Sequence, residues 1–97
     1  MPLQTVEWTP RLLFDHDPDA IEVYRVDWSE WLDGETLVQS AVFPTEINAV
    51  IVASTTTTVD IRVSGGVLNA TAEVTVRADS SGGRRQDRTL RFRVLRR

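Results

Sequence analysis

The sequence has no cysteine, no lysine and a single histidine, His16. Without cysteine there is no disulfide framework, thiolate nucleophile, iron–sulfur cluster or cysteine-bound zinc. With one imidazole to serve every hydroxyl, the composition argues against a catalytic triad. Long apolar runs are also missing, because the longest, Ala49–Ala53, falls far short of the about 20 residues that a membrane-spanning helix needs. We therefore expect no cofactor and no membrane partner.

The chain is also short. Its 97 residues suffice for one domain with an ordinary core but leave little room for an enclosed active site. No basic run followed by an apolar segment marks a secretory signal near Met1, so we expect cytosolic synthesis. These features predict a small protein that is not an enzyme.

The formal charge of −3 hides an uneven distribution. Residues 1–35 carry a local charge of −7, whereas residues 77–97 carry +6, all of it from arginine. Such a polarised chain can pair its arginine-rich end with its own acidic segment or with that of a neighbouring copy. Both alternatives remain open from the sequence.

The C-terminal half has the period of β-strands. Apolar residues alternate with polar ones over residues 70–78 and again over residues 89–94, on either side of the turn-forming stretch 79–83. This pattern predicts a β-hairpin with Phe92 buried and Arg91 and Arg93 facing outward. A further alternating segment, 59–63, predicts another strand.

Strands are also predicted upstream. Residues 22–28 place Tyr24, Val26 and Trp28 on one face, and residues 47–52 are rich in β-branched side chains. Two shorter candidates, 36–39 and 41–43, are separated from their neighbours by Gly34 and Pro44. Between them and residues 22–28, residues 29–32 can form one helical turn with Ser29 as its cap.

Six or seven short strands in about 100 residues predict an all-β fold, a small immunoglobulin-like antiparallel β-sandwich, with a small barrel as the alternative. Residues 1–16 lack a clear period and form either a first strand or an N-terminal arm that docks on a neighbour. We therefore divide the chain into this N-terminal segment and a sandwich domain over residues 17–97.

The most reactive-looking stretch is Asp15-His16-Asp17-Pro18-Asp19. Its alternate carboxylates resemble the start of a calcium loop, but Ala20 and Val26 stand where that loop needs glycine and a bidentate glutamate. The calcium-loop interpretation fails, and a solvated acidic turn with His16 exposed is the simpler expectation, although a looser ion site stays open.

The arginine-rich hairpin suggests two kinds of contact. It could bind phosphates of nucleic acid, but the net charge is negative and Phe92, the one aromatic residue among the arginines, falls on the buried face. We therefore favour contacts with acidic protein surfaces over nucleic acid. Together with the apolar and aromatic residues of the N-terminal segment and of the helical turn, the predicted protein-interface residues are Trp8, Leu12, Leu13, Phe14, Trp31, Arg84, Arg85, Arg88, Arg91 and Arg93.

Several short motifs follow one another in order along the chain. They are Asp17-Pro18-Asp19-Ala20, Val26-Asp27-Trp28-Ser29, Trp31-Leu32, Gly34-Glu35-Thr36-Leu37, Thr56-Thr57-Thr58-Val59, Val63-Ser64-Gly65-Gly66, Val74-Thr75, Gly83-Arg84 and Asp87-Arg88-Thr89-Leu90. As a set they resemble a family of short structural proteins of tailed bacteriophages and prophages. The resemblance implies an Ig-like virion component, made in the cytoplasm of the host bacterium, and no catalytic residue.

Three functions follow as expectations. The first is a capsid decoration or cement protein that binds the lattice of the major capsid protein, or other virion proteins, as a homo-oligomer. The second is an Ig-like domain of the tail, baseplate or a fibre that contacts the host surface. The third is a small nucleic-acid-binding protein that uses the arginines of the hairpin.

Overall fold

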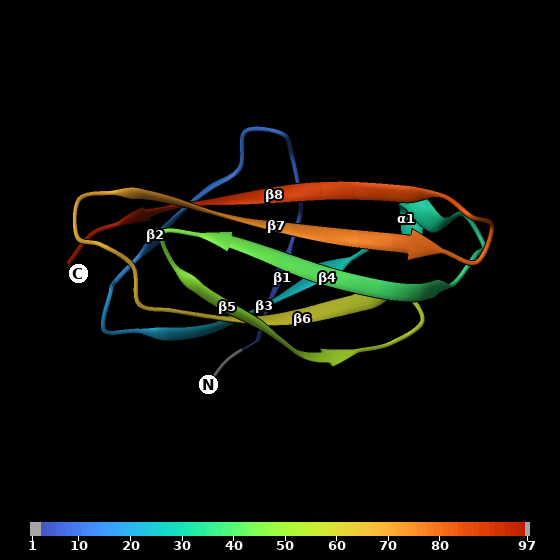
Figure 1. Ribbon diagram of the computed structural model, residues 1–97, viewed down its shortest axis with the longest axis horizontal. Helices are drawn as coiled ribbons and strands as arrows, with labels where there is room; N and C mark the ends of the chain where they lie inside the picture. Colours follow the sequence, from blue (N-terminus) through green and yellow to red (C-terminus); the bar gives the residue numbers. More distant parts are fainter. Residues whose placement is uncertain (1–2, 97) are drawn as a thin grey trace.

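The computed structural model describes residues 3–96 as two four-stranded β-sheets packed face to face (Figure 1). One sheet has the order β1-β3-β6-β5 and the other the order β2-β8-β7-β4. The elements, in chain order, are β1 (Leu3–Val6), β2 (Leu13–His16), β3 (Ile21–Asp27), α1 (Ser29–Leu32), β4 (Leu37–Thr45), β5 (Asn48–Ser54), β6 (Thr58–Ser64), β7 (Thr71–Ser80) and β8 (Arg85–Val94). The predicted β-sandwich is confirmed.

The sheets are mixed rather than purely antiparallel, which corrects one part of the prediction. β1 pairs with β3 in parallel and β2 pairs with β8 in parallel, whereas all other neighbours are antiparallel. The two parallel pairs arise because the N-terminal segment contributes a short strand to each sheet and crosses between them over residues 7–12.

The core lies between the two sheets and follows the period-two pattern of the sequence. In β7 and β8 alternate residues are buried, and Phe92 is fully buried while Arg93 is exposed, as predicted. Phe92 stacks on Phe14 of β2 and packs against Tyr24 of β3, with ring centroids 5.5 Å apart in both pairs. Trp28, which the sequence pattern places on the same face as Tyr24 and Val26, has no exposed surface. The aromatic residues thus join strands from both sheets at the centre of the sandwich.

His16 is buried, and the expectation of an exposed loop histidine is wrong. It ends β2, where it pairs with Val94, and its ring lies edge-on to Phe92 with centroids 6.1 Å apart. Pairing with β8 turns one face of β2 toward the core. The sequence did not indicate this face, because acidic residues surround His16. Met1 and Pro2, the first residues of the predicted N-terminal segment, lie outside the described part of the chain.

Residues 37–45 form one strand instead of the two short strands expected on either side of residue 40. β4 continues through Pro44 because it pairs only with β7, and an edge strand tolerates a residue without an amide hydrogen. An irregularity between Leu37 and Gln39 shifts the register near its start.

The predicted helical turn is present as α1, but Ser29 is not its cap. Trp28 occupies the N-cap position, and the carboxylate of Asp27 accepts a hydrogen bond from the Ser29 backbone amide at 2.9 Å. The turn ends at Asp33, which adopts a left-handed conformation one residue before Gly34. No helix within residues 3–96 has the length and apolar character needed to cross a bilayer.

Candidate interaction surface

The end of the sandwich that carries α1 brings together residues from both ends of the sequence. The guanidinium carbon of Arg88 lies 4.2 Å from the ring centroid of Trp28 and 5.4 Å from that of Trp8. Trp28 meets Trp31 edge-on with centroids 5.4 Å apart, and Arg84 covers Trp31 at 4.5 Å. We call these five residues the Trp–Arg stack. It joins the N-terminal segment, α1 and the β7–β8 hairpin into one surface.

Hydrogen bonds fix Arg84 and Trp8 within the stack. Arg84 donates to the backbone oxygens of Trp31 and Leu32 at 3.0 and 3.1 Å and to Glu35 Oε1, so it closes the exposed carbonyl end of α1. The indole Nε1 of Trp8 donates to the Thr89 carbonyl oxygen at 3.0 Å. These bonds hold both outer tryptophans against the hairpin.

The side chain of Arg88 is partly buried, and this burial affects its hydrogen bonding and its pKa. Its Nη1 donates to the Asp27 carbonyl oxygen at 3.1 Å, whereas its Nε is buried and has no hydrogen-bond partner among the described residues. Burial lowers the pKa of Arg88, although Asp27 and Glu30 nearby oppose that shift. The tryptophan rings beside it therefore stabilise a cation that has lost part of its hydration.

A groove of about 530 Å³ opens beside the Trp–Arg stack. Trp8 and Arg88 line it together with three carboxylates, Glu7, Asp27 and Glu30. Hydrogen bonds from Ser29 hold the pKa of Asp27 below its ordinary value, so its carboxylate stays ionised. The groove combines an aromatic wall with negative charge, a surface suited to a cationic or aromatic side chain of another protein.

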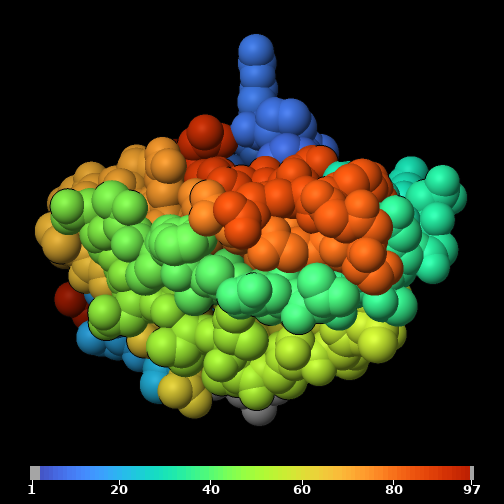
Figure 2. All heavy atoms as spheres, turned by 45° about the vertical axis from the view of Figure 1, so that its right-hand side comes forward, coloured from blue at the N-terminus to red at the C-terminus, as the bar shows by residue number. Residues whose placement is uncertain are grey.

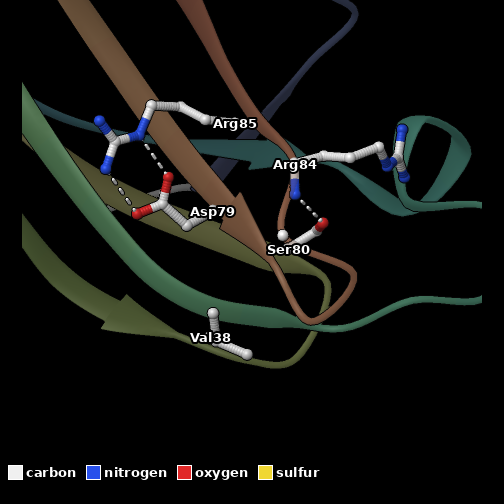
Figure 3. Close-up of a pocket in the computed structure, with 6 residues that line it drawn as sticks. Val38, Asp79, Ser80, Arg84 and Arg85 are labelled. Carbon is white, nitrogen blue, oxygen red and sulfur yellow. Dashed lines mark hydrogen bonds and ion pairs between the residues drawn. The ribbon is translucent and has the colours of Figure 1, made fainter.

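A second, more open pocket of about 450 Å³ lies at the tip of the β7–β8 hairpin (Figure 3). Arg85 Nε lies 2.6 Å from Asp79 Oδ1, and the Ser80 hydroxyl accepts a hydrogen bond from the Arg84 amide at 3.1 Å. Val38 of β4 forms the opposite side of the pocket. The charged residues of this pocket already pair with partners in the same chain. They therefore leave few charged groups available to bind a ligand.

The outer face of β7 and β8 carries a ladder of ion pairs. The pairs Arg77–Asp87 and Arg85–Asp79 each form two hydrogen bonds, and Arg91 approaches Glu73 at 3.7 Å. Charges from the acidic first third of the chain complete the pattern: Arg84 pairs with Glu35, Arg93 with Asp15 and Arg96 with Asp19. These three arginines therefore pair with acidic residues of the same chain.

The predicted interface residues fall into separate regions. Trp8, Trp31, Arg84 and Arg88 meet in the Trp–Arg stack, whereas Leu12 and Phe14 pack partly buried against the core. Leu13 is 48% exposed. Part of the N-terminal segment, in blue, projects from the body of the molecule in Figure 2. Sequence reasoning missed the acidic groove, because Glu7 and Glu30 are distant in the sequence and line the same groove only in the folded chain.

The acidic stretch around His16 does not gather into a metal site. Asp17 accepts a hydrogen bond from the Asp19 amide at 2.9 Å, the geometry of a local Asx turn. Within residues 3–96, no three histidine, aspartate or glutamate side chains lie close enough to hold one ion.

The fold defines a small β-sandwich protein built of two mixed four-stranded sheets. A family profile described as "Podophage GP4 fiber-tail adaptor protein gp77" matches residues 16–93. The chain therefore belongs to this family of bacteriophage virion structural proteins, and the resemblance stated from its motifs is confirmed. No curated protein matches the chain. The family match begins at the last residue of β2, so β1 and the crossover to β2 lie outside it.

Proposed function

We propose that this protein is a non-enzymatic adaptor of the phage tail that joins a fibre to the tail body. The observation that carries the proposal is the family match over residues 16–93, whose description names a fiber-tail adaptor. That description fits the tail-associated alternative drawn from the sequence better than capsid decoration. Binding to major capsid protein has no support from the family, so the partners we propose are tail and fibre proteins.

The structure supports this role because an adaptor needs distinct, preorganised contact surfaces. The Trp–Arg stack holds α1 against the hairpin, so the groove lined by Trp8 and Glu30 needs little ordering when a partner binds. Aromatic and arginine side chains in such a setting supply most of the binding energy in protein interfaces. We place the contact with one neighbour at this end of the sandwich.

Leu13 and the crossover before β2 offer a second contact. The exposed Leu13 and the crossover before it lie on the β2–β8 side, where Arg91 donates to the Pro10 carbonyl oxygen at 2.8 Å. An adaptor that uses this side for one component and the groove for another connects two partners through one domain.

The location is tested by separating purified virions into heads and tails and identifying the protein in each by mass spectrometry. We expect it in the tail fraction together with fibre protein. Recovery in heads alone would overturn the proposal and return attention to capsid decoration.

The groove is tested by capture of purified tail and fibre proteins on the immobilised chain. Glu30→Lys reverses one charge in the groove and is expected to weaken capture of one component at least tenfold. Glu46→Lys makes the same change at an exposed turn before β5 and serves as the matched control. Equal capture by both variants would remove the groove from the proposed interface.

A further inference from the structure

The sandwich leaves four strand edges, and all four carry some protection against pairing with another chain, which in β5 is a single bulge at Val52. β1 and β2 are only four residues long, and β4 contains Pro44. β5 is seven residues long and has neither a charged residue nor a proline. Open edges without such features are templates for strand addition. β5 is thus the edge most suited to receive another strand.

The exposed side chains of β5 include two valines, Val50 and Val52, which are 46% and 44% exposed. The segments of β4 and β5 run along one side of the molecule's surface (green to yellow-green, Figure 2). Ile51 packs against the core and pairs with Ile61 of β6. An uncharged, valine-rich edge gains stability when a second apolar strand covers it.

The sequence of β5 reads nearly the same in both directions. Around Ile51, Val50 matches Val52 and Ala49 matches Ala53, with the small polar residues Asn48 and Ser54 at the ends. When two copies of such a strand pair antiparallel about a two-fold axis at Ile51, each residue meets its own kind from the other copy. An isologous interface requires this self-complementarity.

The backbone of β5 is regular over its first four residues and irregular after them. The register with β6 runs without interruption from Asn48 to Ile51, and an irregularity then leaves Val52 without a counterpart on β6. This bulge is the feature of β5 that hinders edge pairing, because bulges add local twist.

We propose that two copies of this protein associate through β5. The β1-β3-β6-β5 sheets of the two copies then form one continuous sheet, with Ile51 on the two-fold axis. The strand that pairs with β5 is the β5 of a second copy. The two near-palindromic strands match residue for residue, and this match requires no charged side chain. The association is independent of the proposed adaptor function, since it concerns the chain alone.

The proposed register can be tested by placing like or opposite charges at the paired positions 50 and 52. In the proposed pair Val50 of one copy faces Val52 of the other. The double variant Val50→Glu with Val52→Glu places like charges opposite each other at two points, whereas Val50→Glu with Val52→Lys places opposite charges there. The introduced glutamate at position 50 lies beside Arg62 of β6 in both variants, so the two differ only at position 52.

Sedimentation equilibrium of the full chain measures the outcome. We expect a dimer for the unchanged chain, a dissociation constant at least tenfold weaker for the Glu/Glu variant, and recovery for the Glu/Lys variant. Val38→Lys, on the exposed part of β4, is the control and should leave the dimer intact. Circular dichroism confirms that each variant folds.

Cross-linking gives a second readout, because the chain has no cysteine of its own. Ile51→Cys should form a disulfide-linked dimer on mild oxidation, whereas Val50→Cys should not, since Val50 faces a valine. A monomer at all concentrations overturns the proposal, as does a dimer that the Glu/Glu variant leaves unchanged. A monomer whose Glu/Glu variant loses capture of a tail protein also overturns it, because a different chain then occupies β5.

Discussion

The guanidinium carbon of Arg88 lies 4.2 Å from the ring centroid of Trp28, although the two residues are 60 positions apart in the sequence. Trp8 covers the same cation from the N-terminal segment. One arginine of the last strand thus connects the segment after β1 with the only helical turn of residues 3–96. The integrity of the proposed interaction surface depends on this contact.

We predict that Arg88→Ala destabilises the fold by about 1–2 kcal/mol, through loss of two cation–π contacts and the hydrogen bond to Asp27. Urea denaturation followed by tryptophan fluorescence measures this change directly. Arg62→Ala, on an exposed position of β6, is the control and should change stability by less than about 0.5 kcal/mol. Equal effects at the two positions would contradict a stabilising role for the stack.

The centre of the core provides a second matched comparison. Phe92→Ala removes a fully buried ring that contacts Phe14 and Tyr24, and we expect a loss of about 3–5 kcal/mol. Phe43→Ala removes the same group from a side chain that is 47% exposed, and it should cost about 1 kcal/mol or less. Thermal unfolding of both variants distinguishes them, and similar losses would mean that the core is centred elsewhere.

Alanine substitutions at two glycines with positive φ distinguish the cost of a steric clash from the cost of backbone strain. Gly66 has φ 103°, and an added Cβ would lie 2.9 Å from Val94 Cγ2, whereas Gly83 has φ 83° and open space around it. We expect Gly66→Ala to cost about 2–3 kcal/mol and Gly83→Ala about 1 kcal/mol. Chemical denaturation tests the order, and a larger loss at Gly83 would contradict it.

Acid should destabilise the protein. Hydrogen bonds from Arg85 and Arg77 hold the pKa values of Asp79 and Asp87 below the ordinary value of 3.8, and bonds from Ser80 and Arg84 lower the pKa of Glu35. Groups whose pKa is lowered by folding contribute stability above their unfolded pKa and lose it as the pH falls through the folded pKa. The free energy of unfolding should therefore be level above about pH 5 and decline below about pH 4.

Denaturation curves collected between about pH 7 and pH 2 measure this decline. In Asp79→Asn with Asp87→Asn, two of the titrating groups are absent, so the decline should be shallower than in the unchanged chain. An equally steep decline would show that carboxylates outside the β7–β8 ladder control acid stability.

The strands that were predicted well are those with a regular buried face. Ala72, Val74 and Val76 alternate with polar residues and face the core, which placed β7 correctly from the sequence. His16 was misjudged because its inward direction comes from pairing with Val94, near the other end of the chain, and not from its neighbours. Pro44 misled for a related reason, since its tolerance depends on β4 being an edge.

For the proposed interaction surface, the sequence predicted the participating residues but not their arrangement. Tryptophan and arginine are residue types that concentrate binding energy, so Trp8, Trp31, Arg84 and Arg88 were identifiable. Their arrangement was not, because the contacts between Trp8 and Arg88 and between Arg84 and Trp31 close loops of more than 50 residues. Local patterns carry no information on such pairings.

The place of β8 inside its sheet, between β2 and β7, has a consequence for synthesis on the ribosome. β2 emerges among the first segments but pairs only with β8, so it stays without its partner until residues 85–94 have left the exit tunnel. Folding of this sheet is therefore delayed until translation has passed the final strand. A ribosome that stalls before β8 would release a chain in which β2 and one edge of β7 are unpaired, a ready target for the host's proteases.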